Sequence, residues 1–517
     1  MNRRRFVQGL AVAASASTIR LRTAAAALTA PPDAVLSLAD RLAHDPLRPQ
    51  YHLLPTANWM NDPNGPIYWR GQYHMFYQYN PEGAFWGDMH WGHATSPDMI
   101  HWRQLPVALA PTAGGPDSAG VFTGTAAVVD GRVQMLYTGV RSVPESEATI
   151  KNGNQSLLET QCVAISEADN LDRWTKLAKP VIATPPAGMQ VNGFRDPSPW
   201  HDGDFWYLVL GSGTETRGGA VLLYRSKDLR RWEFLHVLAE REGSIAVPLS
   251  KPDSREVWEC PDFFPLGEGV AQRHVLIYST NGRSYWISGR LSPRTMRFEP
   301  EHSGVLDYGS YYAPKTQLDA EGRRILWGWI PETRSLEAYK AAGWAGLMSL
   351  PRLLTLGEDG RLRQQVAGAV EQLRREEKVL RPGTPVVQQL ATMPLENYCG
   401  ELRFKARSTT WAMECVEDSG QTWLRLEFSA SKPQSLMVNS MEIPMMMDSG
   451  DSLECRIWVD GSSMEILING LTAYTLRYYP AGTKARTLRL RWEGAEGDLQ
   501  QLSLWQMEPI SPDRLTR

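Results

Sequence analysis

Three acidic residues stand at matched positions in a recurring pattern of this chain: Asp62, Asp196 and Glu259. They lie nine, seven and eight residues before a glycine that opens a run of aromatic and aliphatic residues. Cleavage of a glycosidic bond needs two carboxyl groups, one ionised and one protonated. Equivalent positions would bring the three acids into one site, where like charges raise at least one pKa. Their spacing therefore predicts acid/base and nucleophilic chemistry on a sugar.

The local sequences around these acids are WMNDPNG, FRDP and WECPD. Taken singly, each has a structural explanation: an Asn-Gly or Asp-Pro turn, an ion pair between Arg195 and Asp196, or a solvent-facing glutamate at a strand end. Trp258 beside Glu259 offers desolvation, which raises the pKa of a carboxyl group. The three matched registers together favour one site over three unrelated structural features.

Five repeats contain the glycines and must position the acids. Each turn precedes a strand-like run such as QYHMFYQY or DFWYLVLGS, and the turns lie at Gly71, Gly131, Gly203, Gly267 with Gly269, and Gly322. Their spacing of about 53–72 residues corresponds to one four-stranded sheet with its loops. The pattern predicts an all-β fold with a five-bladed β-propeller over residues 45–350, whose inner strands bring equivalent positions to the axis. A jelly roll or sandwich is the alternative, but it does not predict the regular spacing.

A second domain is expected after the repeats. Residues 351–382 are predicted to be a linker, because 366–380 are charged and compatible with a helix. Residues 383–517 then show alternating segments such as ELRFKARS and TLRLRW, which are typical of a β-sandwich.

Composition narrows the function. The formal net charge of −3 over 517 residues argues against binding to nucleic acid or an anionic membrane. Abundant aromatic residues, with Trp 19 and Tyr 18, suit an uncharged sugar. The five cysteines form no metal-binding or disulfide pattern, so we expect buried thiols and no metal or organic cofactor.

The N-terminus is expected to be an export signal over residues 1–30. Arg3, Arg4 and Arg5 precede a small-residue run that is too short to span a bilayer, which is typical of the twin-arginine pathway. A basic tail is the alternative. We expect the mature protein to be soluble and outside the cytoplasm, periplasmic or secreted.

The motifs WMNDPNG, FRDP and WECPDFF, in this order, resemble those of glycoside hydrolase family 32, which includes invertases, levanases and inulinases. Further similar segments are FYQYNP at 76–81, WGHATSPDMIHW at 91–102, LDYGSYYAPKT at 306–316, GWAGLMSLPRLL at 343–354 and VDGSSMEILING in the second domain. The resemblance covers nearly everything after the export signal. It implies a five-bladed propeller followed by a β-sandwich, in agreement with the repeats.

The resemblance also implies roles for residues. Asp62 would be the nucleophile, Glu259 the acid/base and Asp196 a stabiliser that holds fructosyl hydroxyls. The fructose pocket would be formed by Asn61, Gln78, Trp86, Phe122, Thr123, Arg195 and Tyr312. Thr123 stands where serine is usual, and Pro314 and Lys315 stand where less bulky or amide residues are usual. These differences are expected to alter the subsite walls and hence substrate preference.

The expected reaction is retaining hydrolysis of β-fructosides through a covalent fructosyl-enzyme. Exo attack is expected because bulky aromatic residues would close the pocket rim: Trp86, Trp91, Phe122, Tyr311 and Tyr312. The alternatives are a fructosyltransferase, a related arabinanase or xylosidase, and a non-catalytic fructan-binding protein. The choice among sucrose, levan and inulin and the oligomeric state stay open.

Overall fold

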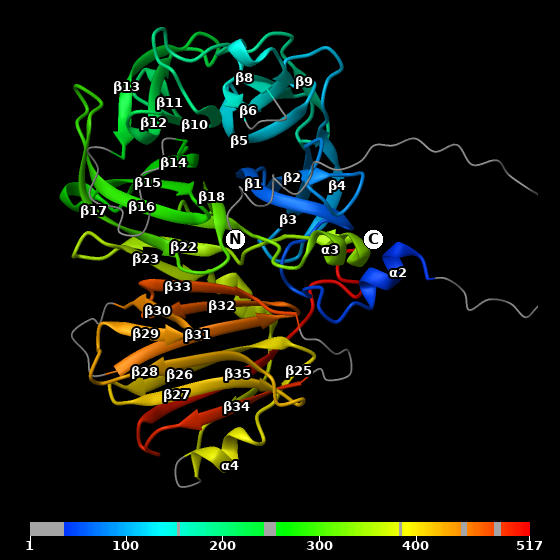
Figure 1. Ribbon diagram of the computed structural model, residues 1–517, viewed down its shortest axis with the longest axis vertical. Helices are drawn as coiled ribbons and strands as arrows, with labels where there is room; N and C mark the ends of the chain where they lie inside the picture. The colour runs from blue at the N-terminus through cyan, green and yellow to red at the C-terminus, as the bar shows by residue number, and fades with distance from the viewer. Residues whose placement is uncertain (1–35, 152–155, 242–254, 382–384, 446–451, 480–486) are drawn as a thin grey trace, which may run out of the picture.

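The computed structural model of the chain describes residues 36–151, 156–241, 255–381, 385–445, 452–479 and 487–517 (Figure 1). Nearly all of their regular structure is β, so the predicted all-β class is confirmed. The short helices are α2 (Leu38–Ala43), α3 (Leu336–Ala342), α4 (Val386–Leu390) and the 3-10 helices η1 (Glu145–Glu147), η2 (Gly269–Ala271) and η3 (Gly368–Leu373). The predicted export signal lies outside the described residues.

Five sheets follow one another along the N-terminal part. The first contains β20 (Trp344–Ala345), β1 (Asn58–Trp69), β2 (Gln72–Asn80), β3 (His90–Ser96) and β4 (Arg103–Leu109). The second contains β5 (Gly120–Val129), β6 (Arg132–Ser142), β8 (Ser156–Ser166), β7 (Ile150–Lys151) and β9 (Trp174–Lys176). The third contains β10 (Gly193–Asp202), β11 (Phe205–Thr214), β12 (Gly218–Ser226) and β13 (Glu233–Glu240).

The fourth sheet contains β14 (Glu259–Leu266), β15 (Arg273–Thr280), β16 (Arg283–Leu291) and β17 (Phe298–Asp307). The fifth contains β18 (Tyr312–Leu318), β19 (Arg324–Ile330), β21 (Leu347–Met348), β22 (Arg352–Leu356) and β23 (Leu362–Val366). The first strands β1, β5, β10, β14 and β18 contact one another in sequence, and β18 returns to β1. They form a closed ring, so their equivalent positions face a common centre.

The five predicted hairpins are confirmed. The turns at Gly71, Gly131, Gly203, Gly267 and Gly322 join the first and second strands of the sheets, with η2 following Gly267. All five glycines have φ between 59° and 84°. A residue with a Cβ is strained in this left-handed region, which explains why glycine marks each repeat.

A break in strand register also recurs in every first strand. The breaks lie between Met60 and Pro63, Phe122 and Gly124, Arg195 and Ser198, Glu259 and Asp262, and Tyr312 and Lys315. A bulge bends its strand and re-aims the local side chains. Three bulges also contain a non-glycine residue with positive φ: Asp196 at 67°, Cys260 at 51° and Ala313 at 52°. The positions that carry the predicted acids are therefore shaped by the same local device.

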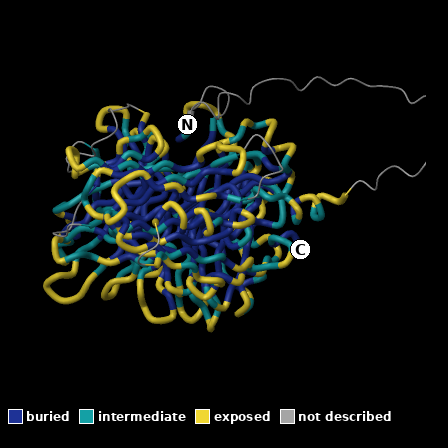
Figure 2. The backbone as a smooth tube through the Cα atoms, turned by 90° about the horizontal axis from the view of Figure 1, so that it is seen from below, coloured by how far each residue is buried: buried dark blue, intermediate teal, exposed yellow. Residues whose placement is uncertain are grey.

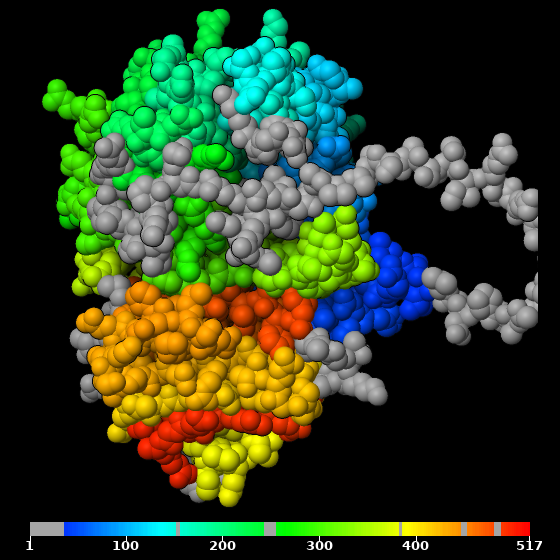
Figure 3. Space-filling view, viewed as in Figure 1, coloured from blue at the N-terminus to red at the C-terminus, as the bar shows by residue number. Residues whose placement is uncertain are grey.

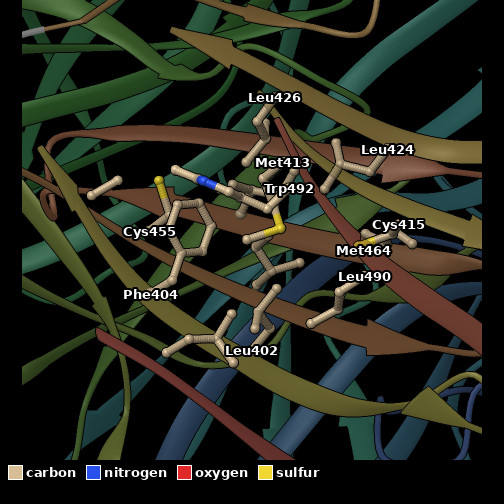
Figure 4. Close-up of a cluster of buried hydrophobic side chains, with 14 of the residues drawn as sticks. Leu402, Phe404, Met413, Cys415, Leu424, Leu426, Cys455, Met464, Leu490 and Trp492 are labelled. Atoms are coloured by element: carbon tan, nitrogen blue, oxygen red, sulfur yellow. The ribbon is translucent and has the colours of Figure 1, made fainter. Parts of the chain in front are cut away.

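Two six-stranded sheets form the C-terminal part. One contains β24 (Arg374–Val379), β35 (Leu499–Met507), β26 (Cys399–Arg407), β31 (Ser452–Asp460), β32 (Ser463–Ile468) and β33 (Thr472–Arg477). The other contains β25 (Leu395–Glu396), β34 (Thr487–Glu493), β27 (Trp411–Glu417), β28 (Thr422–Phe428), β29 (Ser435–Val438) and β30 (Met441–Pro444). Leu402, Phe404, Met413 and Leu426 belong to one buried cluster that draws on both sheets (Figure 4).

Burial is concentrated inside both parts, and the exposed backbone lies mainly in turns at the periphery (Figure 2). All five cysteines are buried free thiols, as expected. The space-filling view shows the C-terminal part packed directly against the sheets of the N-terminal part (Figure 3).

The predicted linker over 351–382 is wrong. Strands β22 and β23 complete the fifth sheet, and β24 pairs with β35 at the edge of a C-terminal sheet. Between β23 and β24 the chain forms the 3-10 helix η3. The charges of 374–379 mark a solvated edge strand, where charged side chains block pairing with other chains, and not a helical connector.

A fully buried ionic network joins the two parts. Arg352 donates from Nη2 to Glu465 at 2.6 Å and to Asp307 at 3.0 Å. His52 lies between two carboxylates, with Nδ1 2.8 Å from Asp460 and Nε2 3.0 Å from Glu465. Because both ring nitrogens face acceptors, only the imidazolium satisfies both contacts. Glu465 and Asp460 belong to the C-terminal sheets and Arg352, Asp307 and His52 to the N-terminal part, so the network ties them together.

Candidate active site

The three predicted acids meet at the centre of the strand ring. Asp62 lies on β1, Asp196 on β10 and Glu259 at the start of β14, and all three are buried. Cys260 links them, because its Sγ lies 3.5 Å from Oδ2 of both Asp62 and Asp196 and its N–H donates to Asp196 at 2.8 Å. The expectation that matched repeat positions converge is therefore confirmed for these side chains.

The Asp62 carboxylate is held at both oxygens. Asn61 Nδ2 donates to Oδ1 at 3.1 Å, and Thr123 Oγ1 donates to Oδ2 at 2.6 Å. Gln78 connects these donors, since its Oε1 accepts from Asn61 at 3.1 Å and its Nε2 donates to Thr123 at 2.5 Å. Trp59 Nε1 in turn fixes the Asn61 oxygen at 2.7 Å. Hydrogen bonds to a carboxylate favour its ionised form and orient it, as a nucleophile requires.

Glu259 is held differently, by one cation and one phenol. Arg195 Nη2 donates to Oε1 at 2.8 Å, and the Tyr312 hydroxyl donates to Oε2. The expected desolvation by Trp258 is not observed: this indole stacks on Tyr278, with centroids 4.0 Å apart, in a core cluster between the third and fourth sheets. Neighbouring residues of an extended chain point to opposite faces, so the tryptophan and the glutamate separate.

The carboxyl group of Asp196 has a raised pKa. Burial raises the pKa of its carboxyl group to about 6, although Arg195 opposes this, and the charges of Asp62 and Glu259 raise it further. Its backbone N–H donates to Thr138 Oγ1 at 2.8 Å, which supports the strained bulge conformation. The raised pKa of Asp196 thus comes mainly from burial, and the crowding of the three acids adds a smaller increase.

Of the five aromatic residues predicted for the pocket rim, three lie near the acids and two do not. Trp86 and Phe122 meet edge to face with centroids 6.0 Å apart, and both pack against the cluster that contains Tyr312. Trp91 is instead fully buried in the core cluster of the first and second sheets, and Tyr311 lies under Arg352. These two do not form a pocket rim, because their side chains point between sheets.

Pro314 and Lys315, which are expected to alter the subsite walls, follow Tyr312 on β18. Both residues are buried, and Lys315 Nζ donates to the Pro261 carbonyl oxygen at 2.8 Å. The bulge after Tyr312 turns the Lys315 side chain across to β14. Lys315 thus braces the backbone two residues after Glu259.

Three further residues of the site were not predicted: Cys260, Thr138 and Glu159. Glu159 is fully buried on β8 and accepts from Arg195 Nη1 at 2.7 Å. Cys260 follows Glu259 in the recognised motif and could have been proposed on that ground. Nothing in the local sequence of Glu159 or Thr138 connects either residue to an acid on another sheet.

Within the described residues, no group of three or more His, Cys, Asp or Glu side chains is arranged to hold a metal ion. No helix in that part of the chain is long and apolar enough to cross a membrane. The arrangement consists of one carboxylate held by neutral donors, a second held by Arg195 and Tyr312, and a third between them with a raised pKa.

Comparison with known proteins identifies the family to which both parts of the chain are similar. The glycosyl hydrolases family 32 N-terminal domain matches residues 52–366, and the family 32 C-terminal domain matches residues 418–506. Sucrose-6-phosphate hydrolase of Escherichia coli is 33% identical over 480 residues, covering 89% of this chain and 94% of that protein. Raffinose invertase of Escherichia coli is 34% identical over 494 residues, covering 89% and 95%.

Among solved structures, fructan 1-exohydrolase IIa of Cichorium intybus superposes with a TM-score of 0.72 at 26% identity, covering 90% of this chain and 98% of that one. The likeness therefore extends over both parts of the chain, and the acids lie within the matched N-terminal domain. The chain belongs to glycoside hydrolase family 32 and is a glycoside hydrolase that acts on fructosides.

Proposed function

We propose that the protein is a retaining exo-β-fructosidase that releases terminal β-D-fructose from sucrose or fructans. The observation that carries this proposal is the unequal treatment of two carboxyl groups in one buried site. Asp62 is oriented by hydrogen bonds from Asn61 and Thr123, whereas Glu259 lies between Arg195 and Tyr312. Retaining glycosidases require such a pair, one nucleophile and one proton donor.

In the first step, Glu259 gives its proton to the glycosidic oxygen while Asp62 attacks C2 of the fructosyl unit. The C2–O bond breaks, its electron pair goes to the leaving oxygen, and a fructosyl ester forms on Asp62. In the second step, Glu259 removes a proton from water, which attacks C2 and frees fructose and the Asp62 carboxylate. Asp196 would hold fructosyl hydroxyls.

The assigned scaffold is a five-bladed propeller followed by a β-sandwich. The closed ring of first strands supports five blades, and the two six-stranded sheets with a shared apolar cluster support the sandwich. The sandwich begins at β24 rather than at residue 383, and the propeller extends through β23.

Exo attack is proposed because Trp86 and Phe122, with Tyr312, gather aromatic bulk beside the acids. The relatives point the same way, since they include a fructan exohydrolase, a sucrose-6-phosphate hydrolase and a raffinose invertase. A fructosyltransferase shares the first step and differs only in the acceptor of the second.

Incubation with sucrose, raffinose, 1-kestose, levan and inulin, followed by chromatography at early times, tests the proposal. Free fructose as the sole initial fructan product is expected, and a ladder of fructo-oligosaccharides contradicts exo attack. Oligosaccharides longer than the substrate at high sucrose would instead indicate a transferase. For a retaining mechanism, NMR during the reaction is expected to show that fructose is released first as the β-anomer.

The variants Asp62→Asn and Glu259→Gln test the two roles. Each is expected to lower kcat by at least about 10³-fold, because each removes a group that makes or breaks bonds. Asp117→Asn is the matched control, a buried aspartate in the turn before β5 that accepts from Tyr137 at 2.9 Å. Near-normal turnover in a folded Asp62→Asn protein would overturn the mechanism. Azide should partly rescue Glu259→Ala on an activated fructoside, because this anion needs no general base.

We further propose export by the twin-arginine pathway, which Arg3, Arg4 and Arg5 ahead of a small-residue run support. Expression of the full chain with a marker substrate outside the cytoplasm tests this. Activity of the unaltered chain that stays in the cytoplasm, just as it does when the three arginines are replaced by lysine, would refute the proposal.

A further inference from the structure

A buried carboxylate lies behind the arginine that holds Glu259. Glu159 is fully buried on β8, in the second sheet, and its Oε1 accepts from Arg195 Nη1 at 2.7 Å. Arg195 reaches in the other direction to Glu259, at 2.8 Å from Nη2. One guanidinium is therefore shared by two carboxylates from different sheets.

The positive charge of Arg195 is balanced by this pair of carboxylates. Burial disfavours the guanidinium, but Glu159, Glu259 and Asp196 outweigh it and hold the pKa of Arg195 above its ordinary value. A guanidinium with only Glu259 to satisfy it would place a full positive charge on the group that must carry a proton in the first step. Such a charge favours the ionised carboxylate, so that less of Glu259 carries the proton needed in the first step.

Glu159 also has a structural contact, which must be separated from its charge. Its Oε2 accepts from the backbone N–H of Phe194 at 2.6 Å and helps to place β10 beside β8. A glutamine side chain offers one carbonyl oxygen of the same reach and can accept that hydrogen bond. The backbone contact therefore does not need a negative charge, whereas neutralising the positive charge of Arg195 does.

We propose that Glu159 is a positioning residue of the acid/base machinery, which neutralises Arg195 and so keeps Glu259 protonated in the working pH range. The inference rests on the proposed role of Glu259 as the acid. The other charged and titratable groups around Arg195 and Glu259 are Asp62 from β1, Asp196 from β10, Cys260 from β14, and Tyr312 and Lys315 from β18. Glu159→Gln leaves all of them in place.

The test is the pH dependence of kcat/KM for sucrose, which has no titratable group in this range. The basic limb reports the carboxyl group that must be protonated in the free enzyme. In Glu159→Gln, we expect this limb to move to lower pH by about one unit, because one negative charge near the acid is gone. At pH values above both basic limbs, kcat/KM of Glu159→Gln is then about tenfold lower than that of the wild type. A merely structural loss would lower kcat/KM equally at every pH.

Two further variants make the result decisive. Glu159→Asp keeps the charge but shortens its reach, so its limb should lie between those of the wild type and Glu159→Gln. Glu401→Gln is the matched control, a fully buried glutamate of the C-terminal part that pairs with Arg374 at 2.7 Å and Arg456 at 2.8 Å. Its limb should coincide with that of the wild type.

A Glu159→Gln limb that coincides with the wild-type limb would overturn the inference and leave the proposed function intact. If Glu159→Gln does not fold, a Glu159→Asp limb at or above the wild-type pH overturns it equally. Absence of fructose release by the wild type would instead refute the proposed function. The two failures are therefore distinguishable in one set of profiles.

Discussion

Replacing His52 by glutamine tests the ionic network that joins the two parts of the chain. Burial opposes the charged ring, but hydrogen bonds to Asp460 and Glu465 and their charges raise the pKa of His52 from 6.5 to about 9. Because both ring nitrogens contact carboxylates, the charged form is the one that the fold requires. The same network includes Arg352, which lies over the Tyr311 ring next to the proposed substrate residue Tyr312.

The sign and size of the effect follow from the pKa. A pKa of about 9 in the folded protein and 6.5 in the unfolded chain corresponds to about 3 kcal/mol of stability. Because the folded-state pKa is raised, this stability is fully present below pH 6.5 and is lost as the pH rises through about 9. His52→Gln cannot carry the charge, so its unfolding free energy lacks this dependence.

Urea denaturation followed by tryptophan fluorescence, from about pH 6 to about pH 10, measures the effect. The difference between wild type and His52→Gln should shrink by about 3 kcal/mol across this range. His101→Gln is the control, because His101 also pairs with an aspartate, Asp98 at 2.7 Å, but at the surface. A wild-type minus His52→Gln difference that stays constant with pH would refute the reasoning.

Two further predictions concern the candidate site. Thr123→Val removes the hydroxyl that donates to Asp62 at 2.6 Å and should lower kcat/KM about 10–100-fold, whereas Thr123→Ser should retain activity; equal activity of the two in a sucrose assay contradicts the role of this hydrogen bond. Asp196→Asn should abolish turnover and yet raise the unfolding free energy at neutral pH by about 3 kcal/mol. Burial raises the pKa of Asp196 from 3.8 to about 6, so ionisation costs stability as the pH rises between these values. A less stable Asp196→Asn protein in urea denaturation at pH 7 would show that this carboxylate stabilises the fold.

Much of the fold was predictable because its determinants are local. A glycine with positive φ is needed at each tight turn, so Gly71 and its four counterparts revealed the hairpins. Counting back from those turns located Asp62, Asp196 and Glu259, because a fixed strand length gives equivalent residues the same place on the ring. The family followed from the motifs around these acids. Residues 351–382 were misassigned because an exposed edge strand and a surface helix are both charged, and only pairing with β35 distinguishes them.

The sequence by itself therefore determined the all-β class, the five hairpins, the family and the three acids. Only the tertiary structure decided which side chains surround each acid. Glu159 approaches Arg195 from a strand of another sheet, and the bulges turn Lys315 towards the Pro261 carbonyl and Cys260 towards two carboxylates. These contacts depend on how the sheets pack around the ring and on how each bulge rotates its side chains. Neither is recorded in the order of residues along one strand, because each contact joins segments that are distant in sequence.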